Sequence, residues 1–318
     1  MLKLEGVTKR YGSVFALKDV SFSASQGQVL GLLGQNGAGK TTTLNILTGY
    51  LSATCGSVTI GGHDILHDPR VAKRLMGYLP EHPPLYDEMT VESYLRFCCQ
   101  LKEVTRGAIP AHIAEILKTT GLDEVAGRRL GNLSKGFRQR AGIAQALCGA
   151  PEVLVLDEPT VGLDPRQITE IRALIKKLGE KHTVVFSSHM LHEIQALCSR
   201  VVILHKGRLI KEADMQALTG NTGDTLRLRV SIRMKERLLL PALHGLDGVK
   251  RVEVLPTQNI EITEAVLECQ RDKNPEEKLF TLLSGLQAPL LRLMPMIDTL
   301  EEVFLQATSR MDDPEKED

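Results

Sequence analysis

The chain has 318 residues, of which 42% are hydrophobic and 25% are charged, a composition typical of a globular protein long enough for two domains. Its 39 basic and 39 acidic residues cancel, so it lacks the basic excess of a protein that binds nucleic acid or an anionic membrane surface. The six cysteines form no CxxC pair and no His/Cys cluster at metal-ligand spacing, which favours reduced thiols over a disulfide framework.

Neither a secretory leader nor a membrane span is predicted. The N-terminal stretch MLKLEGVTKRYG lacks the apolar core of a signal peptide. No window holds eighteen uninterrupted apolar residues, and the most apolar late stretch, 282–296, is interrupted by polar residues and two prolines. If the protein serves a membrane process, we therefore expect another chain to span the bilayer.

The N-terminal region is predicted to be mainly β-structure. Alternating apolar and polar residues indicate partly exposed antiparallel strands, while the apolar run VLGLLG indicates a buried strand that leads into a glycine-rich turn. Helical spacing follows, and then a hairpin with Gly61 and Gly62 at its turn. The predicted elements are strands 2–11, 16–25 and 28–34, a helix at 40–51 and a hairpin at 57–65.

A helical region is predicted between residues 84 and 130, with Thr90 near the start of its first helix. From residue 134 onward, helices and apolar strands alternate, which is typical of a parallel sheet covered by helices. The predicted elements are helices 89–102, 109–122, 134–149, 166–180 and 191–199, strands 152–158 and 182–189, and a strand pair within 200–213.

The C-terminal third is predicted to be a separate small α+β domain. Residues 1–219 would form the first domain, 220–224 a linker, 225–308 the second domain and 309–318 a charged tail. Within the second domain the order β-α-β-β-α-β is typical of a small ferredoxin-like unit. Its predicted elements are strands 225–231, 249–255, 259–268 and 289–294, helices 233–244 and 275–287, and a closing helix at about 298–308.

A phosphate-binding loop is predicted between the strand 28–34 and the helix 40–51. The motif GxxxxGK[ST] is met by Gly34, Gln35, Asn36, Gly37, Ala38, Gly39, Lys40 and Thr41, followed by Thr42. Its glycines allow backbone N–H groups to surround phosphate oxygens, and the helix dipole favours the same anion. We expect Lys40 to reach the β- and γ-phosphates of a nucleotide and the Thr41 hydroxyl to bind Mg²⁺. The competing interpretation is a glycine-rich turn without a ligand.

Two carboxylates end the apolar strand VLVLDE. Such a strand would place Asp157 beside the phosphate loop, where it holds Mg²⁺ directly or through water. Glu158 would then polarise the attacking water as a general base. Without the upstream loop, the same pattern would equally describe a buried strand with a solvated acidic end.

These motifs resemble those of ABC (ATP-binding cassette) proteins. The segment 133–137, LSKGF, resembles the signature motif LSGGQ of that family, and the segment 157–164, DEPTVGLD, resembles its second acidic motif with the D-loop. His189 stands where the switch histidine of the family belongs, and Tyr11 where its adenine-stacking aromatic residue does. The ordered set covers residues 2–212.

The resemblance implies an α/β fold: a P-loop ABC ATPase cassette with a RecA-like core, an antiparallel β subdomain and a helical subdomain at about 84–130. It also implies a head-to-tail dimer, with either an identical protomer or a paralogue, that holds two ATP molecules with Mg²⁺ at its interface. Ser134 and Gly136 would contact the γ-phosphate held by the other protomer, His189 would help position the water, and Asp164 would communicate between the sites. Ser134 is also a good helix N-cap, and we expect both roles.

Two positions depart from the family pattern. The signature carries Lys135 and Phe137 where Gly and Gln are usual, and a solvated Lys135 is slightly favoured over one near the partner's phosphates. Glu81, in GYLPE, stands where the Q-loop glutamine of the family binds Mg²⁺. A carboxylate is a competent Mg²⁺ ligand, and its extra charge near ATP should make the site more dependent on metal.

Within this family, the chain resembles the ATPases of ABC-2 type exporters. The resemblance rests on GYLPE, LSKG and the segment 298–305, DTLEEVFL. This implies polytopic membrane permease subunits as partners and a peripheral location on the cytoplasmic face of the membrane. The residues 82–86 would lie in the groove that receives the permease, although they could instead cover their own core. The ATPase of an importer remains the close alternative. The chain has a single phosphate loop and a single signature, which disfavours three further alternatives. These are a non-transport cytosolic ABC ATPase, a DNA-repair ATPase with long coiled coils and an unrelated P-loop kinase.

Overall fold

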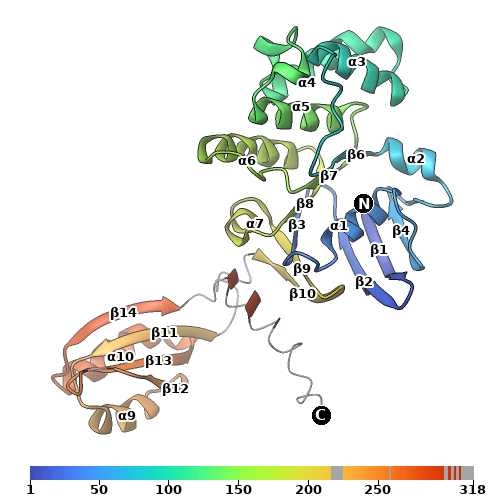
Figure 1. Cartoon of the computed structure of the whole chain (residues 1–318). Helices are drawn as coiled ribbons and strands as arrows, with labels where there is room; N and C mark the ends of the chain where they lie inside the picture. The colour runs from blue at the N-terminus through green and yellow to red at the C-terminus, as the bar shows by residue number, and fades with distance from the viewer. Residues whose placement is uncertain (216–224, 258, 297–299, 302–303, 306–307, 309–318) are drawn as a thin grey trace. The chain divides into compact units, whose positions relative to one another are not determined.

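The computed structural model describes residues 1–215, 225–257, 259–296, 300–301, 304–305 and 308. They divide into two compact units, one formed by residues 1–215 together with residue 308 and one within residues 225–305 (Figure 1). The predicted linker at 220–224 and the predicted tail at 309–318 lie outside the described residues. Within those described ranges, no helix has the length and apolar character needed to cross a bilayer.

An antiparallel sheet opens the first unit, in the order β2-β1-β4-β5. Its strands are β1 (Leu2–Tyr11), β2 (Val14–Ala24), β4 (Cys55–Ile60) and β5 (His63–Asp64). In β1 the side chains of Leu2 and Leu4 are buried while Lys3 and Glu5 between them are exposed, as expected of a sheet with one covered face. The N-terminal β-structure predicted from alternation is therefore present.

The second sheet of this unit has six strands in the order β10-β9-β3-β8-β7-β6. Its strands are β3 (Val29–Leu33), β6 (Met76–Leu79), β7 (Val153–Asp157), β8 (Thr183–Ser188), β9 (Arg200–His205) and β10 (Arg208–Asp214). All neighbouring pairs are parallel except β9 with the edge strand β10. Because the carboxyl ends of parallel strands share one edge, the residues that follow β3, β7 and β8 are brought together there.

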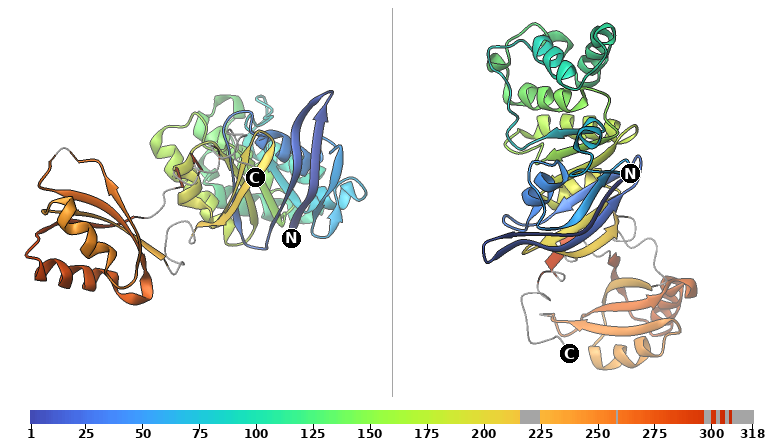
Figure 2. Two further views of the ribbon diagram at one scale, coloured as in Figure 1. Left: turned by 90° about the horizontal axis from the view of Figure 1, so that it is seen from below. Right: turned by 90° about the vertical axis from the view of Figure 1, so that its right-hand side faces the viewer.

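Helices cover this sheet and extend the unit at one end. They are α1 (Lys40–Leu47), α3 (Val91–Leu101), α4 (Ile109–Thr120), α5 (Lys135–Leu147), α6 (Pro165–Gly179) and α7 (Leu191–Leu197). Side chains of α1 join those of both sheets in one core. The helices α3, α4 and α5 stack at the end of the unit farthest from the N-terminal sheet (Figures 1 and 2).

One α-helix and one strand of the first unit are not predicted from the sequence. The helix α2 (Pro69–Arg74) is six residues long, and only Ala72 in it is buried, so it carries no helical periodicity. The strand β6 contains Gly77, a residue depleted in strands. A β-carbon on Gly77 would lie 1.9 Å from the carbonyl oxygen of Ala146, so glycine is needed where α5 packs closely on this strand.

The second unit is a four-stranded antiparallel sheet in the order β12-β13-β11-β14, with two helices. Its elements are β11 (Thr225–Ile232), α9 (Glu236–His244), β12 (Val249–Leu255), β13 (Thr263–Gln270), α10 (Pro275–Gly285) and β14 (Leu290–Met296). The unit has a hydrophobic core of its own, with Leu228, Leu239, Leu267 and Leu279 all buried. The β-α-β-β-α-β order is the one predicted from the sequence.

Two elements of the second unit begin three or more residues later than predicted, and its other boundaries differ by at most two residues. β13 begins at Thr263 and not at 259, because the Asn259 side chain accepts a hydrogen bond from Glu261 N at 3.0 Å and turns the chain there. α9 begins at Glu236 and not at 233, because Arg233 N is bonded to the Pro289 carbonyl. The predicted helix at 298–308 lies largely outside the described residues.

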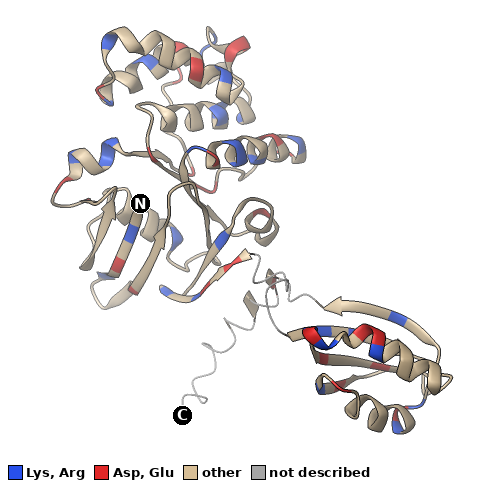
Figure 3. Cartoon of the chain, turned by 180° about the vertical axis from the view of Figure 1, so that it is seen from behind, with Lys and Arg blue, Asp and Glu red and all other residues tan. Residues whose placement is uncertain are grey.

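Acidic and basic side chains are interspersed over the described elements. Figure 3 shows Lys and Arg among Asp and Glu along the helices of both units. This distribution agrees with the balanced charge of the sequence.

Candidate functional site

The phosphate loop connects β3 to α1 and is held between the two sheets of the first unit. Gly39 has a φ of 105°, and a β-carbon there would lie 2.7 Å from Leu17 Cδ2 in β2. A β-carbon on Gly34 would lie 2.6 Å from the carbonyl oxygen of Leu204 in β9. Only glycine fits these two positions, so the sheets on either side fix the path of the loop.

A cavity of about 580 Å³ opens over this loop. Its lining brings together the predicted site residues Gln35, Asn36, Gly37, Gly39, Lys40, Thr41, Thr42, Glu81, Glu158 and His189. The lining also includes Val14, Phe15, Ala16, Val161, Lys206 and Gly207. Ala38 does not line the cavity and is buried beneath it.

Lys40 lies inside the loop with 6% of its surface exposed. Its ammonium donates hydrogen bonds to the carbonyl oxygens of Gly34 at 2.7 Å and Gln35 at 3.4 Å. Glu158 Oε1 lies 3.6 Å away, which forms a buried ion pair. A buried cation held in this way is suited to meet a phosphate that enters the cavity.

Asp157 ends β7 and is almost fully buried. Its Oδ1 accepts a hydrogen bond from Ser187 Oγ at 2.6 Å. Burial raises the pKa of the Asp157 carboxyl; the Ser187 hydrogen bond and Lys40 oppose this, whereas the nearby charges of Glu158 and Glu81 add to it. An ionised Asp157 is therefore electrostatically under-compensated, a condition that a bound cation would relieve.

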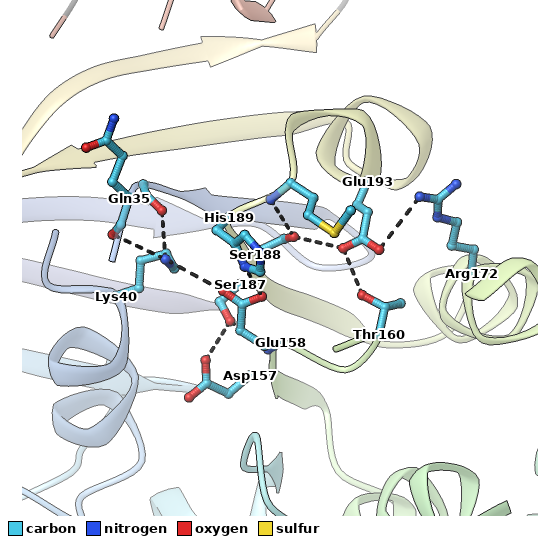
Figure 4. Close-up of polar contacts among 12 residues, drawn as sticks. Gln35, Lys40, Asp157, Glu158, Thr160, Arg172, Ser187, Ser188, His189 and Glu193 are labelled. Carbon is cyan, nitrogen blue, oxygen red and sulfur yellow. Dashed lines mark hydrogen bonds and ion pairs between the residues drawn. The ribbon is translucent and has the colours of Figure 1, made fainter. Parts of the chain in front are cut away.

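Glu158 and His189 are in direct contact. His189 Nδ1 and Glu158 Oε2 are 2.8 Å apart, and the His189 side chain is 46% exposed while that of Glu158 is only 10% exposed (Figure 4). The Glu158 backbone has a φ of 46°, an unusual value for a residue with a side chain, and its N–H donates to Ser187 Oγ at 2.9 Å. The carboxylate is thereby directed toward the cavity from a constrained turn.

The predicted metal ligands fit a magnesium ion that also binds a nucleotide. Thr41, Glu81 and Asp157 offer a hydroxyl and two carboxylates, the hard oxygen donors that Mg²⁺ prefers. Among the described residues, no group of three His, Cys, Asp or Glu side chains could hold a metal ion by itself. The remaining ligands would have to come from phosphate oxygens and water, as is usual for Mg²⁺.

The signature segment does not line this cavity. Ser134 caps α5, since its Oγ accepts a hydrogen bond from Phe137 N at 3.5 Å. Ser134 and Gly136 instead border a separate hollow of about 340 Å³, formed with Gln167 and Arg140. The predicted N-cap role of Ser134 is thus present, while the signature and the phosphate loop of one chain stay apart.

The segment between β7 and α6 links these two regions. Asp164 is exposed and caps α6 by accepting a hydrogen bond from Gln167 N at 2.9 Å. A β-carbon on Gly162 would lie 2.0 Å from Lys135 Nζ, so the exposed Lys135 ammonium rests on this segment. Val161 lines the phosphate cavity.

Tyr11 is not part of the cavity lining. Its ring is 52% exposed at the end of β1, with Lys9 Nζ 5.1 Å from the ring centroid. The exposed ring of Phe15, at the start of β2, lines the cavity instead. The adenine-stacking role of Tyr11 stays a prediction, and Phe15 is a second aromatic candidate that the sequence reasoning missed.

Sequence reasoning also missed a buried polar layer behind the Glu158–His189 pair. It consists of Thr160, Ser188, Glu193 and, at its edge, Arg172 (Figure 4). The signal that could have found it is the placement of Glu193 on α7 next to the buried Ile194, on the face of the helix that packs on the sheet.

Comparison with known protein families and proteins identifies similar sequences. A family model described as "ABC transporter" matches residues 17–161. The chain is 32% identical over 315 residues to the linearmycin resistance ATP-binding protein LnrL of Bacillus subtilis, which covers 98% of this chain and 99% of that protein. It is 35% identical over 242 residues to the bacitracin transport ATP-binding protein BcrA of Bacillus licheniformis, covering 76% and 78% of the two.

Solved structures are similar to the first unit in size and fold. The dimeric structure of MJ0796, a bacterial ABC transporter cassette, matches with a TM-score of 0.61 and 29% identity, covering 68% of this chain and 99% of that one. A dimer of the same cassette in a post-hydrolysis state with ADP and Pi gives the same TM-score at 28% identity and the same coverage.

Proposed function

Because this chain is an ATP-binding, ATP-hydrolysing subunit of the ABC transporter family, we propose that it drives export through separate membrane-spanning chains. The observation that carries the hydrolytic part is the contact between Glu158 and His189 at 2.8 Å, at the edge of the cavity that holds Lys40. A carboxylate beside an imidazole, both facing a phosphate-binding loop, is suited to activate water against the terminal phosphate.

Each side chain of the cavity then has a distinct task. Backbone N–H groups of residues 34–41 and the ammonium of Lys40 bind the β- and γ-phosphates. Glu158 accepts a proton from the attacking water, and His189 holds that water and the γ-phosphate in line. Tyr11 or Phe15 stacks on the adenine.

Magnesium is the proposed metal, held by Thr41, Asp157 and Glu81 together with phosphate oxygens. When bound, it supplies positive charge that offsets the charge developing on the phosphates. The raised pKa of the Asp157 carboxyl supports this assignment, since its burial among carboxylates favours a compensating cation.

A second ATPase protomer completes the site. Dimeric cassettes of the same fold support this arrangement. We assign Ser134 and Gly136 to the γ-phosphate held by the partner, because they border an open hollow that is separate from the phosphate cavity of their own chain. The N-terminus of α5 at Ser134 is suited to an anion. Asp164, on the segment that joins the two regions, would carry signals between the sites.

The membrane permease is proposed to dock beside the helical region, on the cytoplasmic face of the membrane. A groove of about 630 Å³ there is lined by Tyr50, Tyr78, Pro80 and Pro84, among others. Tyr50 is 84% exposed, an unusual exposure for an aromatic side chain. Of the predicted docking residues, Tyr86 packs on Tyr94 and Phe97 of α3, so it also covers its own core.

Export is favoured over import by the relatives. One is named for linearmycin resistance and another for bacitracin transport. Removal of a compound from the cell is one way to resist it, which supports an exporter for this chain as well.

Purification from detergent-solubilised membranes tests the proposal. We expect polytopic membrane chains to co-purify and the complex to hydrolyse Mg-ATP, with a rate that Glu158→Gln lowers by about 1,000-fold. Recovery of the chain only by itself, or with ribosomes or DNA, would contradict a transporter role. Transport assays in vesicles of defined orientation would then separate export from import.

A further inference from the structure

A buried carboxylate lies behind the Glu158–His189 pair and has no part in the mechanism described above. Glu193 is on α7 and is 1% exposed. Ser187 and Ser188 are consecutive at the end of β8, so their side chains point to opposite faces of the sheet. Ser187 bonds Asp157 and Glu158 N on one face, and Ser188 turns to Glu193 on the other.

One oxygen of Glu193 accepts two hydrogen bonds. Thr160 Oγ1 and Ser188 Oγ both donate to Glu193 Oε2, each at 2.8 Å (Figure 4). Both hydroxyls are buried, so water does not compete for them. Ser188 Oγ also accepts a hydrogen bond from Met190 N at 3.0 Å, which fixes the direction in which its own proton points.

The two hydroxyls belong to the two segments that carry the proposed base and the switch histidine. Thr160 lies two residues after Glu158, and Ser188 directly precedes His189. Glu193 Oε2 therefore joins these two segments through the hydroxyls of Thr160 and Ser188. The same two segments also meet at Glu158 Oε2 and His189 Nδ1, which are 2.8 Å apart. The segments that carry Glu158 and His189 are therefore joined at two places, by this pair and by Glu193 Oε2.

Stability alone does not explain a carboxylate at this position. Glu193 Oε1 and Arg172 Nε are buried without hydrogen-bond partners in the described part of the chain. Arg172 Nη2 is 3.7 Å from Glu193 Oε1, a loose ion pair for a buried charge. Apolar side chains often fill such sites at least as stably as an imperfect ion pair. Only a hydrogen-bond acceptor at this position can bind the hydroxyls of both Thr160 and Ser188.

We infer that Glu193 is a positioning residue for ATP hydrolysis, which holds Thr160 and Ser188 so that Glu158 and His189 stay in hydrogen-bond contact. The inference rests on the proposed roles of Glu158 and His189. Glu193 touches neither nucleotide nor water and acts only through these two segments. Geometric errors of this kind reduce the rate of the chemical step more than the binding of substrate.

Steady-state hydrolysis of Mg-ATP by the full chain tests the inference with two substitutions. Glu193→Ala removes the acceptor, and we expect kcat to fall by about 10- to 100-fold with KM for ATP changed by less than about twofold. Glu193→Gln keeps an oxygen that can accept both hydrogen bonds, so kcat should stay within about threefold of wild type. Equal losses for the two variants would overturn the inference.

Ile194→Ala is the matched control for loss of packing. Ile194 is adjacent on α7 and fully buried against β3, but it makes no hydrogen bond to the two segments. It should lower the melting temperature while kcat per folded molecule stays near wild type. If Glu193→Ala behaved like this control, its role would be structural only and the inference would be overturned.

Two further readouts separate this inference from the proposed function. In a Glu158→Gln background, Glu193→Ala should lower the remaining rate by less than about twofold, because no base is left to position. Hydrogen exchange of the amides at 158–163 and 187–190 should accelerate in Glu193→Ala, while the amides at 34–41 should not change. An active wild type with a fully active Glu193→Ala variant would overturn only this inference; a wild-type complex without hydrolysis would overturn the proposed function itself.

Discussion

The phosphate loop and the signature segment lie in the same unit but differ in how completely one chain builds their surroundings. The phosphate loop is enclosed by two sheets, with Lys40 buried and paired to Glu158. The signature segment caps α5 and borders an exposed hollow whose lining includes neither the phosphate loop nor Asp157 and Glu158. The phosphate loop is therefore a nearly complete anion site within one chain, whereas the signature segment supplies only part of such a site.

This difference indicates which properties belong to the monomer. In the arrangement that we propose, a single chain can bind nucleotide, because it holds the phosphate loop in place by itself. Hydrolysis also needs the signature of a second chain, in the arrangement that we propose. Variants on the two sides should therefore fail in different ways.

The largest effect is expected on the phosphate side, from Glu158→Gln. Loss of the general base should lower kcat by about 1,000-fold, within the range of general acid–base contributions. ATP binding should persist, because Lys40 keeps its contact with the Gly34 carbonyl. Size-exclusion chromatography with saturating Mg-ATP should show a trapped dimer. A variant that stays monomeric there would contradict the role assigned to Glu158.

Mixing two inactive variants tests the contrast directly. Lys40→Ala and Ser134→Arg should each lower hydrolysis by about 100-fold, but only Lys40→Ala should weaken ATP binding by the monomer. A mixed dimer has one intact site, composed of the loop of one chain and the signature of the other. Random pairing should restore about a quarter of the wild-type sites. Failure to recover activity would contradict a composite site built from two copies of this chain.

A smaller effect is expected from Glu81→Gln, which removes a carboxylate beside Asp157. The ratio of the affinity for ATP with Mg²⁺ to the affinity for ATP with a chelator should fall by about fivefold. This is the scale of a roughly 1 kcal/mol interaction between exposed charges. Nucleotide affinity with and without Mg²⁺ measures this ratio. Glu88→Gln is the control, since Glu88 is exposed in the same loop but does not line the cavity. An unchanged ratio in Glu81→Gln would contradict a metal role.

The smallest effect is expected from Ser134→Ala on the signature side. Loss of the N-cap should lower the free energy of unfolding by about 1 kcal/mol, measured by urea denaturation. Ser134→Asp should keep the cap and the stability, yet weaken the ATP-bound dimer because its charge faces the partner's phosphates. If Ser134→Ala were as stable as wild type, the observed cap would not contribute to folding.

Strong patterns made most of the fold predictable from the sequence. Alternation located β1 and β2, and apolar runs located β3, β7 and β8, because burial imposes those periods. The short helix α2 and the glycine-containing strand β6 were not predicted, since neither has a clear hydrophobic periodicity. The start of β13 was wrong because the Asn259 side chain turns the chain inside an apparently strand-like stretch.

On the phosphate side, the motifs predicted most of the residues that line the cavity, because loop chemistry restricts which residues fit. The structure places Lys40, Glu158 and His189 around one cavity, as the motifs indicated. Contacts between distant segments were not predictable. Glu193 meets Thr160, 33 residues earlier in the chain, through tertiary packing, and no local spacing in the sequence encodes that contact. Phe15 was missed because an exposed aromatic on a strand has many ordinary explanations.

The backbone of Glu158, with its φ of 46°, places an acid in a conformation that glycine and asparagine adopt more readily. Such strain is typically of the order of 1 kcal/mol or more, and the surrounding contacts must absorb it. Stability and activity therefore make opposing demands at this one position. In a related chain that no longer needs to hydrolyse ATP, glycine or asparagine at this position would relieve the strain. Such a chain would gain stability and lose its general base.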